Sequence, residues 1–165
     1  MKFFLIGFMG AGKSFWGRQW AMHLNYSFID LDKAIEEKIG KPVASIFEEN
    51  GEIFFRKREA EILREILKAD NVIIACGGGT PCYENNMNWM NENGHTVYLS
   101  RSPVELYKNV LKEKWQRPLL KNITDEEILS YIEKKLIERL PFYEKAAVIF
   151  TSEQVNVNSL DKIIR

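Results

Sequence analysis

Short apolar runs alternate with longer amphipathic stretches along this chain of 165 residues. The apolar runs predict buried strands, because a parallel strand that is covered on both faces is apolar at successive positions. They lie at 2–6, 28–29, 72–75, 96–99 and 147–150. The stretches between them predict helices at 14–24, 34–39, 42–50, 51–69, 85–93, 102–112 and 124–140, with a short one at 160–164. Strands that alternate with helices indicate an α/β domain built on a parallel sheet.

Several predicted helix ends coincide with residues that favour such ends. Gly40 follows the helix at 34–39 and suits a helix stop. Pro103 stands at a first helical position, where its missing N–H costs nothing. Thr124 is followed three residues later by Glu127, which has the form of a capping box. Pro141 is expected to interrupt or kink the helix that Thr124 begins, since proline lacks the N–H that the helix needs.

Composition narrows the class of protein further. The chain is 45% hydrophobic and 28% charged, which is typical of one globular domain, so residues 1–165 are expected to form a single unit. Lys and Arg number 23, as do Asp and Glu, so no basic excess suggests a nucleic-acid partner. Cys76 and Cys82 match no zinc pattern and are expected to be reduced thiols. The first apolar run is too short for a membrane span or a signal peptide, so we expect a cytoplasmic protein, as a monomer.

The segment 7–14, G-F-M-G-A-G-K-S, matches the phosphate-binding pattern G-x-x-x-x-G-K-[ST] between a predicted strand and a predicted helix. Gly10, Ala11 and Gly12 let backbone N–H groups approach phosphate oxygens, and the helix that follows adds its positive end. Lys13 supplies a charge for the β- and γ-phosphates of ATP. Ser14 offers its hydroxyl directly to Mg²⁺, which completes its coordination with phosphate and water oxygens. The pattern therefore predicts an ATP site that uses Mg²⁺.

A phosphate loop alone does not distinguish kinases from GTPases, motor ATPases or nucleotide sensors. The chain contains no Asn-Lys-x-Asp motif for reading guanine, and it is short for a motor. A kinase that acts on a small metabolite is the interpretation that these observations favour.

Three further features are candidates for the acceptor side. Asp30 and Asp32 follow the second predicted strand, so both should emerge at the carboxyl edge of the sheet, where ligands bind in such folds. Arg56 and Glu59 are spaced to share one face of a helix. The triple glycine 77–79 follows the third strand and can present N–H groups to an anion. Each feature also has an ordinary structural interpretation: a helix N-cap for the aspartate, a surface ion pair for the helix, and a turn for the glycines.

Together these segments resemble shikimate kinase over essentially the whole chain. The matching segments are GFMGAGKS, FIDLDKAIE, IFEENGEIFFRKRE, ACGGGT, the RPLL segment that begins at Arg117 and the RLPFY segment that begins at Arg139. The resemblance implies a P-loop fold like that of nucleoside-monophosphate kinases, a three-layer α/β/α domain with a five-stranded parallel sheet ordered 2-3-1-4-5. It also implies transfer of the γ-phosphoryl group of ATP to the 3-hydroxyl of shikimate, on the route to chorismate and the aromatic amino acids.

On the acceptor side, the resemblance places a shikimate-binding segment at about 31–60. Asp32 corresponds to the residue that holds the shikimate hydroxyls beside the attacking oxygen. The groups that correspond to those binding the shikimate carboxylate are Arg56, Arg139 and the amide of Gly78, which stands between Gly77 and Gly79. Glu59 corresponds to the residue that orients Arg56. A fork of guanidinium donors suits a carboxylate better than the point charge of lysine does.

On the nucleotide side, Asp30 corresponds to a carboxylate that contacts Mg²⁺ through water, beside the direct ligand Ser14. Arg117 corresponds to an arginine that reaches the ATP phosphates from a mobile lid at about 112–125. Gln154 aligns with the segment that contacts adenine. Phe15, which follows the phosphate loop where many relatives have threonine, is also among the residues expected to bind ATP. Val110 stands where some relatives carry an arginine that stacks on adenine. Asp32, Lys13 and Arg117 are thus the expected catalytic residues.

Two alternatives remain open from the sequence. A kinase of the same fold could act on another polyol acid such as gluconate, although the Arg56 helix and the triple glycine argue against it. A non-catalytic module could bind ATP and signal by closing over it, but such a sensor would not need an acceptor clamp.

Overall fold

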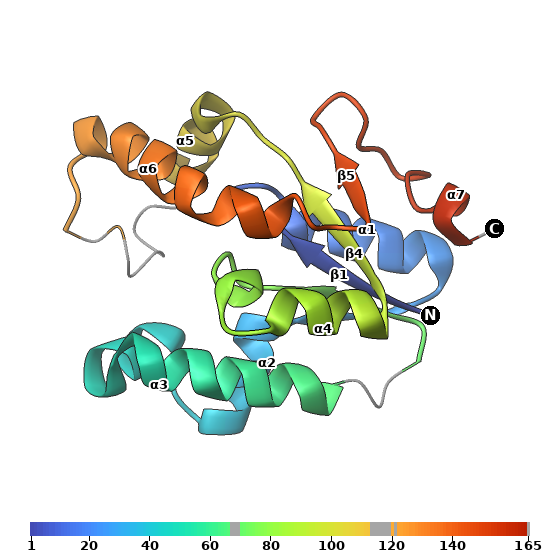
Figure 1. Ribbon diagram of the computed structural model, residues 1–165, viewed down its shortest axis with the longest axis horizontal. Coiled ribbons are helices and arrows are strands. Elements are labelled where there is room, and N and C mark those ends of the chain that lie inside the picture. Colours follow the sequence, from blue (N-terminus) through green and yellow to red (C-terminus); the bar gives the residue numbers. More distant parts are fainter. Residues whose placement is uncertain (67–69, 113–119, 121, 165) are drawn as a thin grey trace.

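The computed structural model describes residues 1–66, 70–112, 120 and 122–164, and its centre is a parallel sheet (Figure 1). The strands are β1 (Lys2–Ile6), β2 (Ser27–Asp30), β3 (Val72–Ala75), β4 (His95–Leu99) and β5 (Val148–Phe150). They are arranged in the order β2-β3-β1-β4-β5, and all four pairings are parallel. The sheet order that the resemblance implied is therefore confirmed.

Helices lie on both sides of this sheet, with α1 and α4 on opposite sides (Figure 1). The helices are α1 (Lys13–Leu24), α2 (Leu31–Ile39), α3 (Val43–Glu65), α4 (Asn86–Asn93), α5 (Pro103–Lys112), α6 (Asp125–Tyr143) and α7 (Asp161–Ile164). A short 3₁₀ helix, η2 (Thr80–Cys82), follows β3 and was not anticipated from the sequence. No helix in the described ranges is long and apolar enough to cross a membrane.

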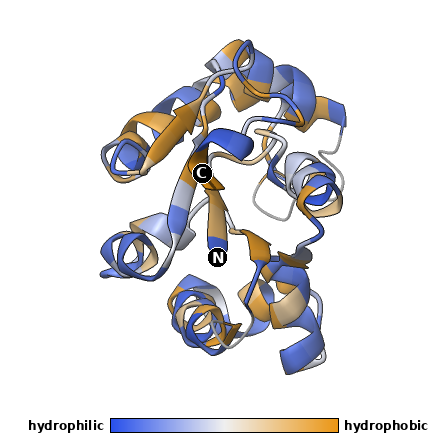
Figure 2. Cartoon of the chain, turned by 90° about the vertical axis from the view of Figure 1, so that its right-hand side faces the viewer, coloured by the Kyte–Doolittle hydropathy of each residue, from blue (hydrophilic) through white to orange (hydrophobic). Residues whose placement is uncertain are grey.

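The apolar runs form the core, as their pattern predicts. Phe3, Phe4, Leu5 and Ile6 on the central strand are all fully buried, and the residues of β3 are at most 4% exposed. Figure 2 shows these apolar strands at the centre, with polar parts of the helices turned outward. Because parallel strands share one direction, their carboxyl ends meet at one edge of the sheet, which brings the loops that follow β1, β2 and β3 together.

The long segment at 43–65 contains the break that the sequence predicts. Gly51 has φ +78° and ψ 174°, which is not helical, and helical backbone lies on both sides of it. A positive φ of this size is accessible to glycine without steric cost. The part of α3 after the break carries Arg56 and Glu59.

Pro141 was expected to interrupt or kink its helix; the interruption is wrong, because α6 continues through Pro141 to Tyr143, and the kink stays a prediction. The capping box at the start of this helix is confirmed, since the amide of Thr124 donates to Glu127 Oε2 at 3.1 Å. At the other end Tyr143 is fully buried, and its hydroxyl donates to the carbonyl oxygen of Gly78 at 2.6 Å. This contact holds the last turn in place although the proline removes one backbone donor.

Gly17 lets α1 approach the sheet closely. A Cβ atom at Gly17 would lie 2.4 Å from Cε2 of Phe28 and 3.1 Å from a methyl group of Leu5. We expect Gly17→Ala to lower the free energy of unfolding by about 1–3 kcal/mol through overpacking, even though alanine is the better helix former. Denaturant unfolding monitored by circular dichroism measures this change.

Met22 provides the matched control, because it lies on the same helix and is 74% exposed. Met22→Ala should change the free energy of unfolding by less than about 0.5 kcal/mol. Equal stability of Gly17→Ala and the wild type would contradict the close packing of α1 on β2.

Candidate active site

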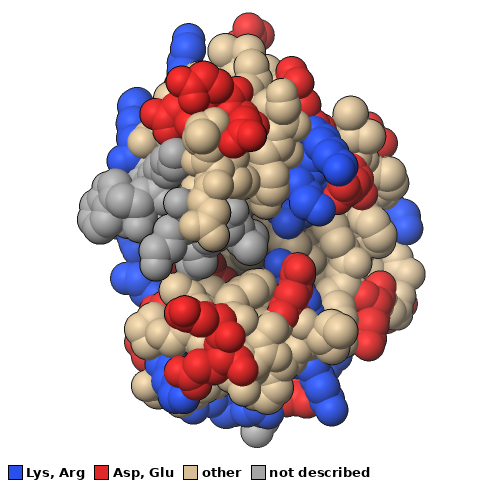
Figure 3. Space-filling view, turned by 90° about the vertical axis from the view of Figure 1, so that its left-hand side faces the viewer, with Lys and Arg blue, Asp and Glu red and all other residues tan. Residues whose placement is uncertain are grey.

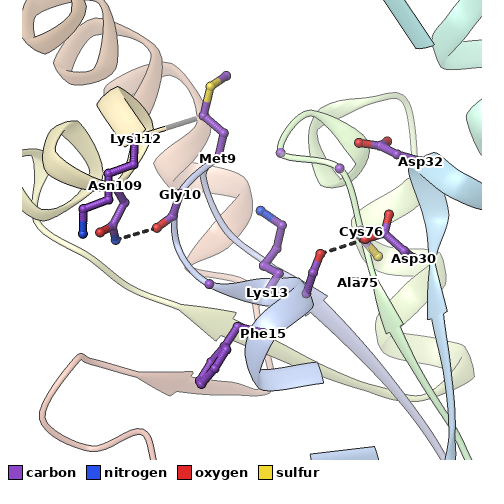
Figure 4. Close-up of a pocket in the computed structure, with 14 residues that line it drawn as sticks. Met9, Gly10, Lys13, Phe15, Asp30, Asp32, Ala75, Cys76, Asn109 and Lys112 are labelled. Carbon is purple, nitrogen blue, oxygen red and sulfur yellow. Dashed lines mark hydrogen bonds between the residues drawn. The ribbon is translucent and has the colours of Figure 1, made fainter. Parts of the chain in front are cut away.

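The phosphate loop lies between β1 and α1, at the carboxyl edge of the sheet. Gly10 and Gly12 have φ values of +80° and +90°, in the left-handed region that favours glycine. The ammonium group of Lys13 donates to the carbonyl oxygens of Gly7 at 2.8 Å and Phe8 at 2.9 Å. The Lys13 side chain thus lies over the loop, inside a cavity of about 440 Å³ (Figure 4).

Two oxygen atoms that could coordinate a metal ion lie next to each other in the lining of this cavity. The hydroxyl of Ser14 donates to Oδ2 of Asp30 at 2.7 Å, from the first turn of α1 to the end of β2 (Figure 4). A hydroxyl and a carboxylate are hard oxygen ligands of the kind that Mg²⁺ prefers. The residues present at this point therefore fit a magnesium ion that is held mainly by phosphate and water oxygens.

Asp32 lies in the first turn of α2, two residues beyond Asp30. The N-cap position of α2 belongs to Asp30, so the interpretation of Asp32 as a helix cap is wrong. The pKa of the Asp32 carboxyl is raised from 3.8 to about 6, mainly by burial and in addition by the carboxylates of Glu59 and Asp30, while the charges of Lys13 and Arg56 act in the opposite direction. The carboxyl group is thus a better proton acceptor than an exposed aspartate.

A second cavity of about 110 Å³ adjoins the first. Met9, Asp32, Gly77 and Gly78 line both cavities, so the two meet at Asp32 and the glycine loop. The remaining lining of the smaller cavity is apolar or cationic: Val43, Phe47, Phe55, Arg56, Gly79 and Arg139. Figure 3 shows the face that contains this region, hollowed between its upper and lower parts. The arrangement offers a negative group at one end and two guanidinium groups elsewhere in the lining.

Glu59 holds Arg56 in place from inside the protein. Its side chain is fully buried; Oε2 accepts from Nη1 of Arg56 at 2.8 Å, and Oε1 accepts from the hydroxyl of Thr80 at 2.6 Å. Both oxygens are thus occupied by charged or polar donors, as a buried carboxylate requires. Glu52, which is exposed, approaches Nε of Arg56 at 3.4 Å. The interpretation of Arg56 and Glu59 as a surface ion pair is wrong.

The triple glycine is explained by close packing of side chains on the loop. A Cβ at Gly79 would lie 2.3 Å from Nη2 of Arg56, and one at Gly78 would lie 3.0 Å from Nη1 of Arg139. A Cβ at Gly77 would lie 2.8 Å from Oε1 of Glu59. Side chains at these positions would push both guanidinium groups away from the loop, so the interpretation as a simple turn is incomplete.

Arg139 reaches the cavity from α6, far along the chain from Arg56. Its guanidinium carbon lies 5.2 Å from the centre of the Phe8 ring, a distance typical of a cation–π contact. One turn later Tyr143 binds the Gly78 carbonyl through its hydroxyl. Burial raises the pKa of this phenol, so the hydroxyl keeps its proton. The end of α6 is thereby fixed to the glycine loop.

Comparison with known proteins identifies the family. The family model described as shikimate kinase matches residues 9–165. This chain belongs to the shikimate kinase family. A shikimate kinase from Phocaeicola vulgatus is 43% identical over 154 residues, which cover 93% of this chain and 88% of the relative.

Solved structures of shikimate kinases agree with this assignment. The enzyme from Bacteroides thetaiotaomicron is 39% identical, with a TM-score of 0.93 over 99% of this chain and 98% of that one. The enzyme from Acinetobacter baumannii, in complex with shikimate, is 33% identical, with a TM-score of 0.85 over 99% of this chain and 89% of that one.

The structure brings most of the predicted site residues to the carboxyl edge of the sheet. The larger cavity is lined by Gly10, Gly12, Lys13, Ser14, Phe15, Asp30, Asp32, Gly77 and Gly78, and the smaller one adds Arg56, Gly79 and Arg139. Ala11 lies in the phosphate loop but is buried. Glu59 lies behind Arg56.

Two predicted residues are not placed in this group. Arg117, with most of the predicted lid, lies outside the described residues. Gln154 lines a different cavity, at the loop after β5, and its side-chain oxygen accepts from the amide of Thr151 at 3.1 Å. The roles of both residues stay predictions.

Several residues of the site were missed in the sequence. Thr80 and Tyr143 lie in the matching segments ACGGGT and RLPFY, but the sequence assigned them no role, because their contacts are with residues distant in the chain. Asn109 donates from its side-chain amide to the carbonyl oxygen of Gly10 at 2.9 Å and lines the larger cavity together with Lys112 (Figure 4). The amphipathic helix at 103–112 predicted a buried face, not a contact with the phosphate loop.

Removal of the Thr80 hydroxyl should leave Oε1 of Glu59 buried without this donor. We expect Thr80→Val to lower the free energy of unfolding by about 2–3 kcal/mol, because an unsatisfied buried acceptor loses its hydration without compensation. Thr80→Ser keeps the hydroxyl and should cost only about 1 kcal/mol for the lost methyl group. Chemical denaturation of both variants tests this order, and a serine variant as unstable as the valine variant would contradict it.

Proposed function

We propose that this protein transfers the γ-phosphoryl group of ATP to the 3-hydroxyl of shikimate, giving shikimate 3-phosphate and ADP. One observation carries the proposal: a phosphate-binding cavity and a smaller cavity with two arginines meet at a single carboxyl group, that of Asp32. This is the arrangement that a donor phosphate and an acceptor hydroxyl need in order to meet.

The smaller cavity has the chemistry of a site for a hydroxylated acid. Arg56 and Arg139 offer paired N–H donors for a carboxylate, and the fixed geometry of Arg56 lowers the cost of ordering it on binding. Phe47 and Phe55, whose ring centres are 4.4 Å apart, supply an apolar wall for the carbon ring. Asp32 then receives the hydroxyls, since a carboxylate accepts hydrogen bonds from more than one of them.

Phosphoryl transfer has a loose transition state, so catalysis depends mainly on alignment and on charge stabilisation. Lys13 would move from the carbonyls of Gly7 and Phe8 onto the β- and γ-phosphates. Asp32 would orient the attacking hydroxyl and accept its proton late in the transfer. Ser14 and Asp30 would hold Mg²⁺, which supplies neutralising charge for the phosphates. On the nucleotide side, Arg117 from the predicted lid would reach the ATP phosphates, and Gln154 would contact adenine.

Measurement of ADP release distinguishes this function from its rivals. We expect rapid ADP release from ATP with shikimate and only slow release with gluconate or without an acceptor. Activity with gluconate alone would favour the polyol-acid rival, and ATP binding without turnover on any acceptor would favour the non-catalytic module.

In the same assay, Arg139→Lys should raise KM for shikimate by about tenfold or more with a smaller change in kcat, because a point charge replaces a pair of guanidinium donors.

The raised pKa of Asp32 predicts an acidic limb in the pH profile. Protonated Asp32 has lost the charge that orients the attacking hydroxyl and cannot take up its proton, so kcat/KM should fall below pH about 6 by about tenfold per pH unit. The Asp32→Asn variant should be much slower and should lack this limb. An acidic limb that persists unchanged in Asp32→Asn would assign the titration to another group.

A further inference from the structure

Phe15 is an aromatic residue left exposed at the nucleotide cavity. Its side chain is 59% exposed, although it lies in the first turn of α1 and lines the cavity that contains Lys13 and Ser14. Burying a phenylalanine ring is worth a substantial free energy, so an exposed one beside a ligand site is available for contact with that ligand.

The ring of Phe15 is supported from behind by other aromatic residues. It packs edge-on against Trp16, with ring centres 5.2 Å apart and an angle of 83°. Trp16 is stacked on Trp20 at 5.8 Å, and Trp20 is fully buried and donates from Nε1 to the carbonyl oxygen of Asn156 at 2.8 Å. This row of rings links α1 to the loop after β5. The ring of Phe15 is therefore held on one side by packing against Trp16.

The position of Phe15 relative to the smaller cavity, which contains Arg56 and Arg139, indicates which part of the nucleotide would reach Phe15. Transfer requires the γ-phosphate to face Asp32, so the rest of the nucleotide must extend away from Asp32. In Figure 4 the Lys13 side chain points toward the region beside Asp32, whereas the Phe15 ring points the opposite way. The end of the cavity at Phe15 is thus the end for the sugar and the base.

We propose that Phe15 supplies the aromatic face on which the nucleobase of ATP packs. The inference rests on the proposed function, since it takes ATP as the donor. Val110 on α5 is fully buried in the core and cannot provide such a surface. The side-chain amide of Asn109, across the cavity, is engaged by the Gly10 carbonyl. Among the described residues that line the larger cavity, Phe15 offers an exposed aromatic ring at the end away from Asp32.

A comparison of ligands with and without a base tests the proposal. Titration calorimetry in the presence of Mg²⁺ would measure the Kd of ADP and of inorganic tripolyphosphate for the wild type, Phe15→Ala and Phe15→Tyr. We expect Phe15→Ala to weaken ADP by ~10-fold, the size expected for the loss of one aromatic stack on a base. Tripolyphosphate has no base, so its Kd should change less than about twofold, and Phe15→Tyr should bind ADP like the wild type.

The exposed residue Met22 on the same helix provides the control, and Met22→Ala should leave both Kd values unchanged. Equal weakening of ADP and tripolyphosphate in Phe15→Ala would show that the ring supports the phosphate loop instead. An unchanged Kd for ADP would show that the ring makes no contact with the base. Either result overturns the proposal, as does a wild type that binds no ADP.

The outcome for Phe15 can be separated from the outcome for the proposed function, because the titration contains no shikimate. If ADP binds through Phe15 but ATP does not phosphorylate shikimate, the aromatic contact stands and the acceptor assignment fails.

Discussion

The rest of the site depends on the hydrogen bonds that the buried carboxylate of Glu59 accepts. It connects α3 to the segment after β3, by accepting hydrogen bonds from Arg56 and from Thr80. An ionised group without exposure is stable only if its oxygens have donors, so these contacts are required and not optional. The same charge helps to raise the pKa of Asp32. One buried group thus positions Arg56, which lines the smaller cavity, and raises the pKa of the Asp32 carboxyl in the same lining.

The site carries a cost in stability that follows from this arrangement. Asp32 has a pKa of about 6 in the folded protein against an ordinary value of 3.8. Its charged form is therefore disfavoured by folding, and this destabilisation is fully present above pH about 6 and absent below about 3.8. The glycines at 77–79 add to the cost, since glycine loses more backbone freedom on folding than other residues. A packed core of apolar strands compensates for both.

Local patterns in the sequence were enough for much of the fold. The strand at Lys2–Ile6 is apolar at successive positions because both of its faces are covered, and that composition is visible without a structure. The break at Gly51 and the capping box at Thr124 also follow from single residues with strong backbone preferences. Pro141 shows the limit of such preferences, because the buried Tyr143 holds the helix beyond it. Packing outweighed the local signal there.

The sequence by itself determined the phosphate loop, because its glycines, lysine and serine act through backbone geometry within eight consecutive residues. It also indicated Asp32, Arg56, Glu59 and Arg139 through their resemblance to shikimate kinase. Only the tertiary structure decided that Glu59 is buried, that Thr80 donates to it and that Tyr143 binds the Gly78 carbonyl. It also showed that the ring of Phe15 is left exposed beside the nucleotide cavity. Burial and contacts between distant segments depend on how the helices pack around the sheet, and no local spacing encodes that packing.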